Sequence, residues 1–140
     1  MRIALSRASV VLLACLAGSA FAQPATEPPD WSEVASVETV EVVTSDEDGS
    51  PRETTVWLAA LDGEGYVRTG STRWGGNLER DPQLLLRIGD REYALRALMI
   101  EDDALRERVA AVFREKYGFT DTALALFRGS RPKIMRLLPR

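Results

Sequence analysis

The clearest candidate for chemistry is the polar, glycine-rich stretch of residues 69–77, which combines several hydroxyl groups with one guanidinium. Gly75 and Gly76 lack a Cβ, so a ligand can come close to the backbone there. A short helical turn is predicted over 77–81, and the free backbone amides at a helix start attract anions. A charge-assisted hydrogen bond from Arg73 would add to this. The stretch therefore predicts a site for an anionic group such as a phosphate.

The chain contains no histidine and a single cysteine, Cys15. This composition excludes Ser-His-Asp and Cys-His nucleophile systems, and it also excludes histidine zinc sites. Acid–base chemistry would have to come from carboxylates, from a bound cofactor, or from the few other titratable side chains, namely Tyr66, Tyr93, Tyr117, Lys116 and Lys133. Hydrolysis by the protein alone is therefore not expected, and no catalytic side chain is predicted.

The acidic turn at residues 46–51 invites comparison with a calcium-binding loop. Its glycine stands at the fourth position instead of the sixth, Pro51 follows closely, and no glutamate occupies the twelfth position. We therefore expect a solvated hairpin tip with Gly49 at positive φ, and no metal site.

The N-terminus has the three zones of a cleavable signal peptide. A basic start is followed by an uncharged, mostly apolar run at residues 8–20 and by the small-large-small sequence Ala20-Phe21-Ala22. A transmembrane anchor is the alternative, but it needs roughly 20 apolar residues and this run is shorter. We therefore expect residues 1–22 to be a signal peptide and the protein to be periplasmic or secreted.

A lipoprotein signal is a second alternative, because Leu12-Leu13-Ala14-Cys15 resembles a lipobox. Cys15 would then carry a lipid and tether the protein to a membrane. After cleavage behind Ala22, by contrast, no membrane association is expected.

The charge of the chain is acidic overall and unevenly distributed. A formal net charge of −3 argues against broad nucleic-acid binding. Residues 27–64 carry eleven carboxylates and one arginine, whereas residues 128–140 carry five basic side chains and no acidic one. We expect these two segments to meet in the fold or to face solvent; a basic surface for an anionic partner is the alternative.

The elements that must position the anion-binding stretch follow from hydrophobic patterning. Residues 23–33 are rich in proline and predict a disordered leader, before one domain over 34–140. Residues 53–61 are apolar on both faces, which is typical of a barrel wall that is also covered outside. Six strands are predicted in all, at residues 37–44, 53–61, 66–69, 84–88, 92–100 and 133–138.

A long helix is predicted between an aspartate cap at Asp102 or Asp103 and Gly118. Its apolar side chains recur at spacings of three and four and form one stripe. A shorter helix is predicted over 121–127. The fold class is therefore α+β: a small, six-stranded, mainly antiparallel barrel with one long amphipathic helix and one or two short helices. An oligonucleotide-binding barrel is the runner-up, but it would need an aromatic stacking ladder that the strands lack.

Four motifs follow one another in an order found in a known family: Gly49-Ser50-Pro51-Arg52, Thr54-Thr55-Val56-Trp57-Leu58, Tyr66-Val67-Arg68-Thr69 and Trp74-Gly75-Gly76-Asn77-Leu78-Glu79-Arg80-Asp81-Pro82. Together they resemble the flavin- and deazaflavin-binding split β-barrels, in particular the deazaflavin-dependent nitroreductase and quinone-reductase branch. The resemblance covers residues 37–117, with a fitting final strand after 131.

The resemblance implies a cleft along the barrel wall for FMN or a deazaflavin, which would carry the hydride. It implies an oxidoreductase for quinone- or nitro-type acceptors, with solvent as the proton source, and the expected signal peptide would make it an exported one; a homodimer is a further expectation. The positions that match the family's cofactor site are Arg52, Thr69, Ser71, Thr72, Arg73, Trp74 and Asn77.

Each of these residues also has a structural interpretation. Arg52 could pair with the acidic strand end, Trp74 could be a core residue and Asn77 could be a helix N-cap. The stretch is poor in basic residues, and the signal lacks a twin arginine, so the chain would be exported unfolded and would acquire a cofactor outside. The alternative function is a cofactor-free binding or interaction domain of the cell envelope that retains the barrel.

Overall fold

The structure is a computed structural model that describes residues 22–118 and 131–140. The expected signal peptide, apart from Ala22, and the short helix expected at 121–127 lie outside the described residues. The elements are α1 (Trp31–Val34), β1 (Thr39–Ser45), β2 (Pro51–Leu61), β3 (Glu64–Thr69), α2 (Arg73–Arg80), β4 (Gln83–Ile88), β5 (Arg91–Met99), α3 (Asp103–Tyr117) and β6 (Lys133–Pro139). None of the helices in this part of the chain is long and apolar enough to cross a membrane.

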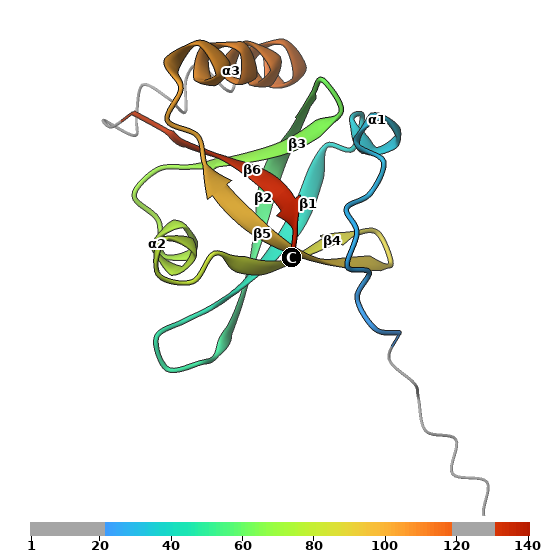
Figure 1. Ribbon diagram of the computed structural model, residues 1–140, viewed down its shortest axis with the longest axis vertical. Coiled ribbons are helices and arrows are strands. Elements are labelled where there is room, and N and C mark those ends of the chain that lie inside the picture. The colour runs from blue at the N-terminus through green and yellow to red at the C-terminus, as the bar shows by residue number, and fades with distance from the viewer. Residues whose placement is uncertain (1–21, 119–130) are drawn as a thin grey trace, which may run out of the picture.

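The six strands form a closed barrel in the order β1-β2-β3-β6-β5-β4, and every pairing is antiparallel (Figure 1). Alternate side chains of each strand point inward. Val42, Leu58, Leu86 and Leu95 are each 0 % exposed and belong to one core cluster inside the barrel. The α+β barrel predicted from the sequence is confirmed, and its six strands lie close to their predicted positions.

Helix α3 lies across the outside of the barrel and builds a second core (Figure 1). Val109 and Phe113 on its apolar stripe are fully buried, and they belong to the same cluster as Ala59 of β2 and Tyr66 of β3. The two-sided apolar pattern of β2 therefore has its expected cause: one face lines the barrel interior and the other lies beneath a helix.

Strand β2 changes its pairing at residue 58. From Pro51 to Trp57 it pairs with β1, and from Leu58 to Leu61 it pairs with β3. The β3 register ends at Leu58↔Val67, so the first half of β2 diverges from the end of β3. This divergence opens the barrel wall at one place and positions the candidate site.

Helix α2 begins earlier than the helical turn predicted at 77–81. Thr72 is its N-cap, and the Thr72 hydroxyl accepts a hydrogen bond from the Gly75 amide. Gly75 and Gly76 lie within the helix, although glycine is a poor helix former. Asn77 is therefore in the middle of α2, and its interpretation as an N-cap is wrong.

The segment expected to be a disordered leader (23–33) is more ordered than predicted. Backbone hydrogen bonds join Ala25 to Glu92 and Ala94 of β5 at 2.9 and 2.7 Å. Trp31 of α1 is 4 % exposed and belongs to the barrel core. A Cβ on Gly65 would come within 2.4 Å of the Trp31 ring, so the indole occupies space that only a glycine leaves free.

The acidic and basic segments do not meet as one expectation proposed. Asp46 pairs with Arg52 inside the acidic segment, and Asp62 pairs with Arg108 of α3. In the basic segment, Arg131 pairs with Asp103 and Lys133 with Glu79. Among the described residues, the ion pairs of the two segments therefore join each of them to other partners and not to one another.

Candidate functional site

Five of the predicted cofactor-binding residues line two neighbouring cavities on either side of the start of α2. Thr69, Thr72 and Trp74 line one of them, and Arg73 and Asn77 line the other. Arg52 is bound to Asp46 of the second cavity, and Ser71 is exposed on the connection between β3 and α2. The seven positions therefore lie near one another, but they do not converge on one ligand.

The first cavity, which we call the threonine groove, lies where β2 and β3 diverge and has a volume of about 270 Å³. Three strands and the start of α2 contribute to it. Hydroxyl groups and two indoles dominate its wall, which is formed by Thr39, Thr55, Val56, Trp57, Arg68, Thr69, Thr72 and Trp74. A wall of this kind offers apolar ring surface together with neutral hydrogen-bonding groups.

The floor of the groove is held by a short network at the end of β3. The Thr69 hydroxyl is buried and forms hydrogen bonds with the Thr72 hydroxyl and with the Gly70 carbonyl. A Cβ on Gly75 would approach the Thr69 Cγ2 to 2.7 Å. The glycine at this position of α2 is therefore needed for close packing of the helix against β3.

Trp57 in the groove wall belongs to a stack of aromatic side chains that continues beneath α3. The Trp57 and Tyr117 rings are parallel, with centroids 4.2 Å apart and an interplanar angle of 6°. The Arg68 guanidinium lies over the Phe113 ring at 4.6 Å and over the Trp57 ring at 5.9 Å. These contacts tie the groove to α3 and fix the orientation of the Trp57 indole.

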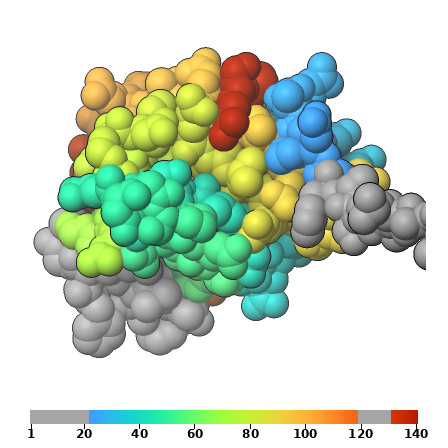
Figure 2. All heavy atoms as spheres, turned by 90° about the horizontal axis from the view of Figure 1, so that it is seen from below, coloured from blue at the N-terminus to red at the C-terminus, as the bar shows by residue number. Residues whose placement is uncertain are grey.

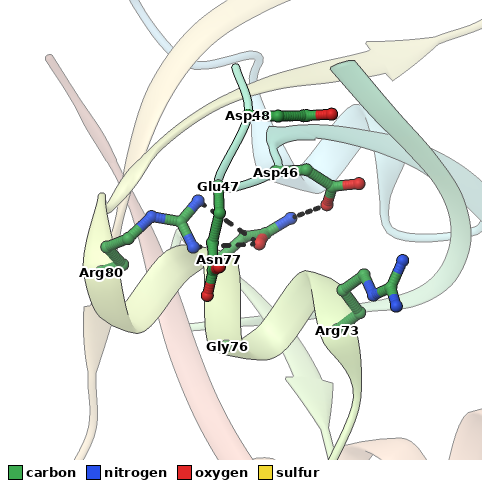
Figure 3. A pocket seen from close by; sticks show the side chains of 7 residues that line it. All are labelled: Asp46, Glu47, Asp48, Arg73, Gly76, Asn77 and Arg80. Atoms are coloured by element: carbon green, nitrogen blue, oxygen red, sulfur yellow. Dashed lines mark hydrogen bonds between the residues drawn. The ribbon is translucent and has the colours of Figure 1, made fainter. Parts of the chain in front are cut away.

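The second cavity, which we call the ionic cavity, lies between the β1–β2 hairpin and α2 and has a volume of about 540 Å³ (Figure 3). Figure 2 shows the hairpin and α2 side by side on this face of the molecule. Charged side chains dominate its wall, which is formed by Asp46, Glu47, Asp48, Arg73, Gly76, Asn77 and Arg80.

Asp46 is the centre of the polar network beside the ionic cavity. Arg52 donates to both carboxylate oxygens, at 2.8 and 2.7 Å, and the Asn77 amide donates to Oδ1 at 2.7 Å. The hydrogen bond from Arg52, followed by that from Asn77, lowers the pKa of Asp46 to about 2. The pairing of Arg52 with the acidic strand end, one of the two interpretations of this residue, is the one observed.

Asn77 and Arg80 fasten α2 to the hairpin. Asn77 is 4 % exposed and also donates to the Thr44 hydroxyl at 3.0 Å. Arg80 donates to the Ser45 carbonyl at 2.5 Å and to the Asn77 side-chain oxygen at 3.4 Å (Figure 3). Both residues therefore have a structural role. Trp74 has one as well, because it is 6 % exposed and belongs to the barrel core.

Two of the side chains considered for acid–base chemistry, Lys116 and Tyr117, fasten α3 to the barrel. Lys116 donates to the carbonyls of Val37 and Leu58 at 2.6 and 2.7 Å. The Tyr117 hydroxyl donates to the Glu38 carbonyl at 2.7 Å and accepts from the Leu58 amide at 3.1 Å. Burial lowers the pKa of Lys116 and raises the pKa of Tyr117. Beyond Trp57, β2 is no longer paired with β1. The hydrogen bonds of Lys116 and Tyr117 to the Leu58 backbone take the place of that pairing.

The prediction from sequence did not include five residues of the threonine groove: Thr39, Thr55, Val56, Trp57 and Arg68. Thr55 and Trp57 do occur in the motif that carries the family resemblance, and their outward-facing positions on β2 were recognisable from the strand alternation. Thr39 and Arg68 join them only because strand pairing brings β1 and β3 to the same place.

Comparisons of structure establish the fold as the split β-barrel. HutZ, the heme storage protein from Vibrio cholerae, aligns with a TM-score of 0.65 and 23% identity over 80% of this chain and 89% of HutZ. The conserved hypothetical protein Rv2991 from Mycobacterium tuberculosis aligns with a TM-score of 0.63 and 24% identity over 86% of each chain. A candidate pyridoxamine 5′-phosphate oxidase from Listeria innocua gives 0.55 and 16%, over 74% of this chain and 84% of that one. No family model and no curated protein matches the sequence.

Proposed function

We propose that the protein is an exported split-barrel protein that binds a flavin or deazaflavin ring in the threonine groove. The observation that carries the proposal is the groove itself, which lies at the divergence of β2 and β3 and presents two indoles beside several hydroxyls. The motif resemblance to flavin- and deazaflavin-binding barrels supports it. The likeness in fold to a candidate pyridoxamine 5′-phosphate oxidase supports it as well.

The residues of the groove fit the ring part of such a cofactor. Trp57 and Trp74 supply apolar contact area, and aromatic side chains favour offset or edge-to-face contact with another ring system. The hydroxyls of Thr39 and Thr55 are neutral partners for the carbonyl and imide groups at the edge of a flavin. A bound flavin would supply hydride transfer, and the protein would supply position and electrostatics.

The phosphate part of FMN fits less well. Arg52 is engaged by Asp46, and Arg73 lines the ionic cavity instead of the groove. The groove residues present one cationic side chain, Arg68, which lies against aromatic rings. The proposed binding therefore depends on contacts between the groove and the flavin ring. Reduction of quinone- or nitro-type acceptors is the reaction proposed for the bound flavin.

A heme is a less suitable ligand, although HutZ is a heme storage protein. Heme iron in proteins is held by histidine, cysteinate, methionine or tyrosine. The chain has no histidine, and the residues that line the threonine groove include none of the other three types. The cofactor-free interaction domain remains the competing proposal, since the fold alone requires no cofactor.

Titration of the purified protein tests the proposal. Isothermal titration calorimetry with riboflavin, FMN and a deazaflavin should detect binding, and protein from its native compartment should be yellow. Thr55→Val removes one groove hydroxyl and should weaken binding by about 2- to 12-fold, the loss of one hydrogen bond. Thr54→Val is the matched control, since Thr54 lies on the other face of β2. Absence of binding at millimolar ligand would leave the interaction-domain proposal in its place.

A further inference from the structure

We infer that the threonine groove selects an unphosphorylated flavin of the riboflavin class over FMN. The inference rests on the proposed function and concerns which flavin the site takes. Three features of the described residues lead to it: the hydrogen bonds of Arg52 to Asp46, the position of Arg73 in the ionic cavity, and the packing of Arg68 against aromatic rings.

Arg52 is not among the residues that line the groove. Its guanidinium is bound instead through two short hydrogen bonds to both oxygens of Asp46. Bidentate arginine–carboxylate pairs of this kind are strong and geometrically specific, so a phosphate would have to displace Asp46.

Arg73 lies at the start of α2 and lines the ionic cavity with Asp46, Glu47 and Asp48 (Figure 3). Its positive charge is the smallest of the causes that lower the pKa of Asp46. A phosphate of charge near −2 placed in this cavity would meet three carboxylates as well as Arg73 and Arg80, and like charges at close range are unfavourable. The arginine expected to hold the phosphate therefore shares its cavity with competing anions.

The groove offers a phosphate one cationic side chain, Arg68, and that side chain is already packed against aromatic rings. Two of the groove hydroxyls already have partners, because Thr69 bonds to Thr72 and Thr72 caps α2 by accepting from the Gly75 amide. Arg68 is packed over the rings of Phe113 and Trp57 at 4.6 and 5.9 Å. The remaining groups are hydroxyls and indole edges, which suit the ribityl hydroxyls and the ring of riboflavin.

The test is the ratio of the dissociation constants of FMN and riboflavin, measured by calorimetry in 50 and 300 mM NaCl. We expect FMN to bind no tighter than riboflavin in either buffer, because Arg52 and Arg73 lie outside the groove and Arg68 is packed against aromatic rings. A guanidinium on the phosphate would instead favour FMN by about 10- to 150-fold. FMN binding at least tenfold tighter than riboflavin, with the difference removed by Arg68→Gln, Arg73→Gln or Arg52→Gln, would overturn the inference and leave the proposed function intact.

A gain-of-preference variant gives an independent check. Thr55→Arg places a guanidinium in the groove and should shift the ratio towards FMN by about tenfold or more. Gln83→Arg, which adds the same charge at an exposed position of β4, should leave the ratio unchanged. If both variants shift the ratio of the dissociation constants equally, overall charge determines the preference for FMN, and this result would contradict the inference. If neither flavin binds to the wild-type protein, the proposed function fails together with the inference.

Discussion

Gly75 is the residue on which the packing of α2 against the barrel depends most directly. An added Cβ would lie 2.7 Å from the Thr69 Cγ2 and 3.0 Å from the Thr72 hydroxyl. Thr69 is β-branched and 2 % exposed, so it has little freedom to move aside. This position therefore couples the helix, the floor of the groove and the end of β3.

Gly75→Ala should lower the free energy of unfolding by about 1–3 kcal/mol through overpacking. Gly76→Ala is the matched control, because a Cβ there meets nothing within 4 Å and alanine is the better helix former by roughly 0.8–1.0 kcal/mol. Urea denaturation of both variants measures the difference. Equal stability of the two variants would show that α2 does not pack closely on Thr69.

Asp46 should make the stability of the protein depend on pH in the acid range. Its folded pKa of about 2 lies below the unfolded value of roughly 3.9, so its contribution is complete above pH 4 and is lost as the pH falls towards 2. The difference in urea midpoint between wild type and Asp46→Asn should therefore be present at pH 6 and disappear near pH 2. Asp90→Asn, at an exposed turn, is the control. A difference that does not change with pH would contradict the paired state of Asp46.

At the level of elements, α3 is the part of the fold whose role the sequence predicted most completely. Val109 is 0 % exposed in the cluster between α3 and the barrel. An unpaired charge on this face is among the few single changes that cost more than about 4 kcal/mol. Val109→Asp should therefore unfold the domain, as followed by circular dichroism on heating.

Ala111→Asp is the control for that variant, because Ala111 is exposed on the same helix. It should melt close to the wild-type temperature. Cooperative, wild-type-like melting of Val109→Asp would mean that the apolar stripe of α3 does not cover the barrel.

The strands and α3 could be predicted because their apolar residues repeat with the period of the element. The start of α2 could not, since two adjacent glycines favour a loop locally and the gain from packing against Thr69 is a tertiary effect. Trp31 was missed for a similar reason, because its partner Gly65 is far away in the sequence. The order of the leader therefore depends on contacts that local composition does not reveal.

The candidate site was predicted only in part, because some of its residues come together through tertiary contacts. Thr69, Thr72 and Trp74 belong to one short stretch and do line the threonine groove. Thr39 and Arg68 join them only through strand pairing. Arg52 and Arg73 have the right chemistry for a phosphate, but both lie at the acidic hairpin instead of the groove. The residue types indicated that the stretch could bind a polar ligand, but strand pairing and helix packing determine which of these side chains lie together.

For the whole molecule, the proposed export gives a direct prediction. Mass spectrometry of the secreted or periplasmic protein should find Gln23 at the N-terminus, because Ala20-Phe21-Ala22 has the pattern of a cleavage site. Ala22→Leu places a bulky residue where a small one is required and should leave the precursor uncleaved. A mature protein that begins with a lipidated Cys15 would contradict this prediction.

The expected homodimer also stays a prediction, and light scattering of the mature protein would measure it.

The most direct test of the central claim is to locate a bound flavin on the protein. In ¹H–¹⁵N spectra recorded during titration with riboflavin, the Trp57 indole N–H and the amides of Thr55 and Thr72 should shift. The amides of Asp48 and Gly76, which line the ionic cavity, should stay in place. Shifts confined to the ionic cavity, or no shifts at all at saturating riboflavin, would contradict the assignment of the threonine groove as the ligand site.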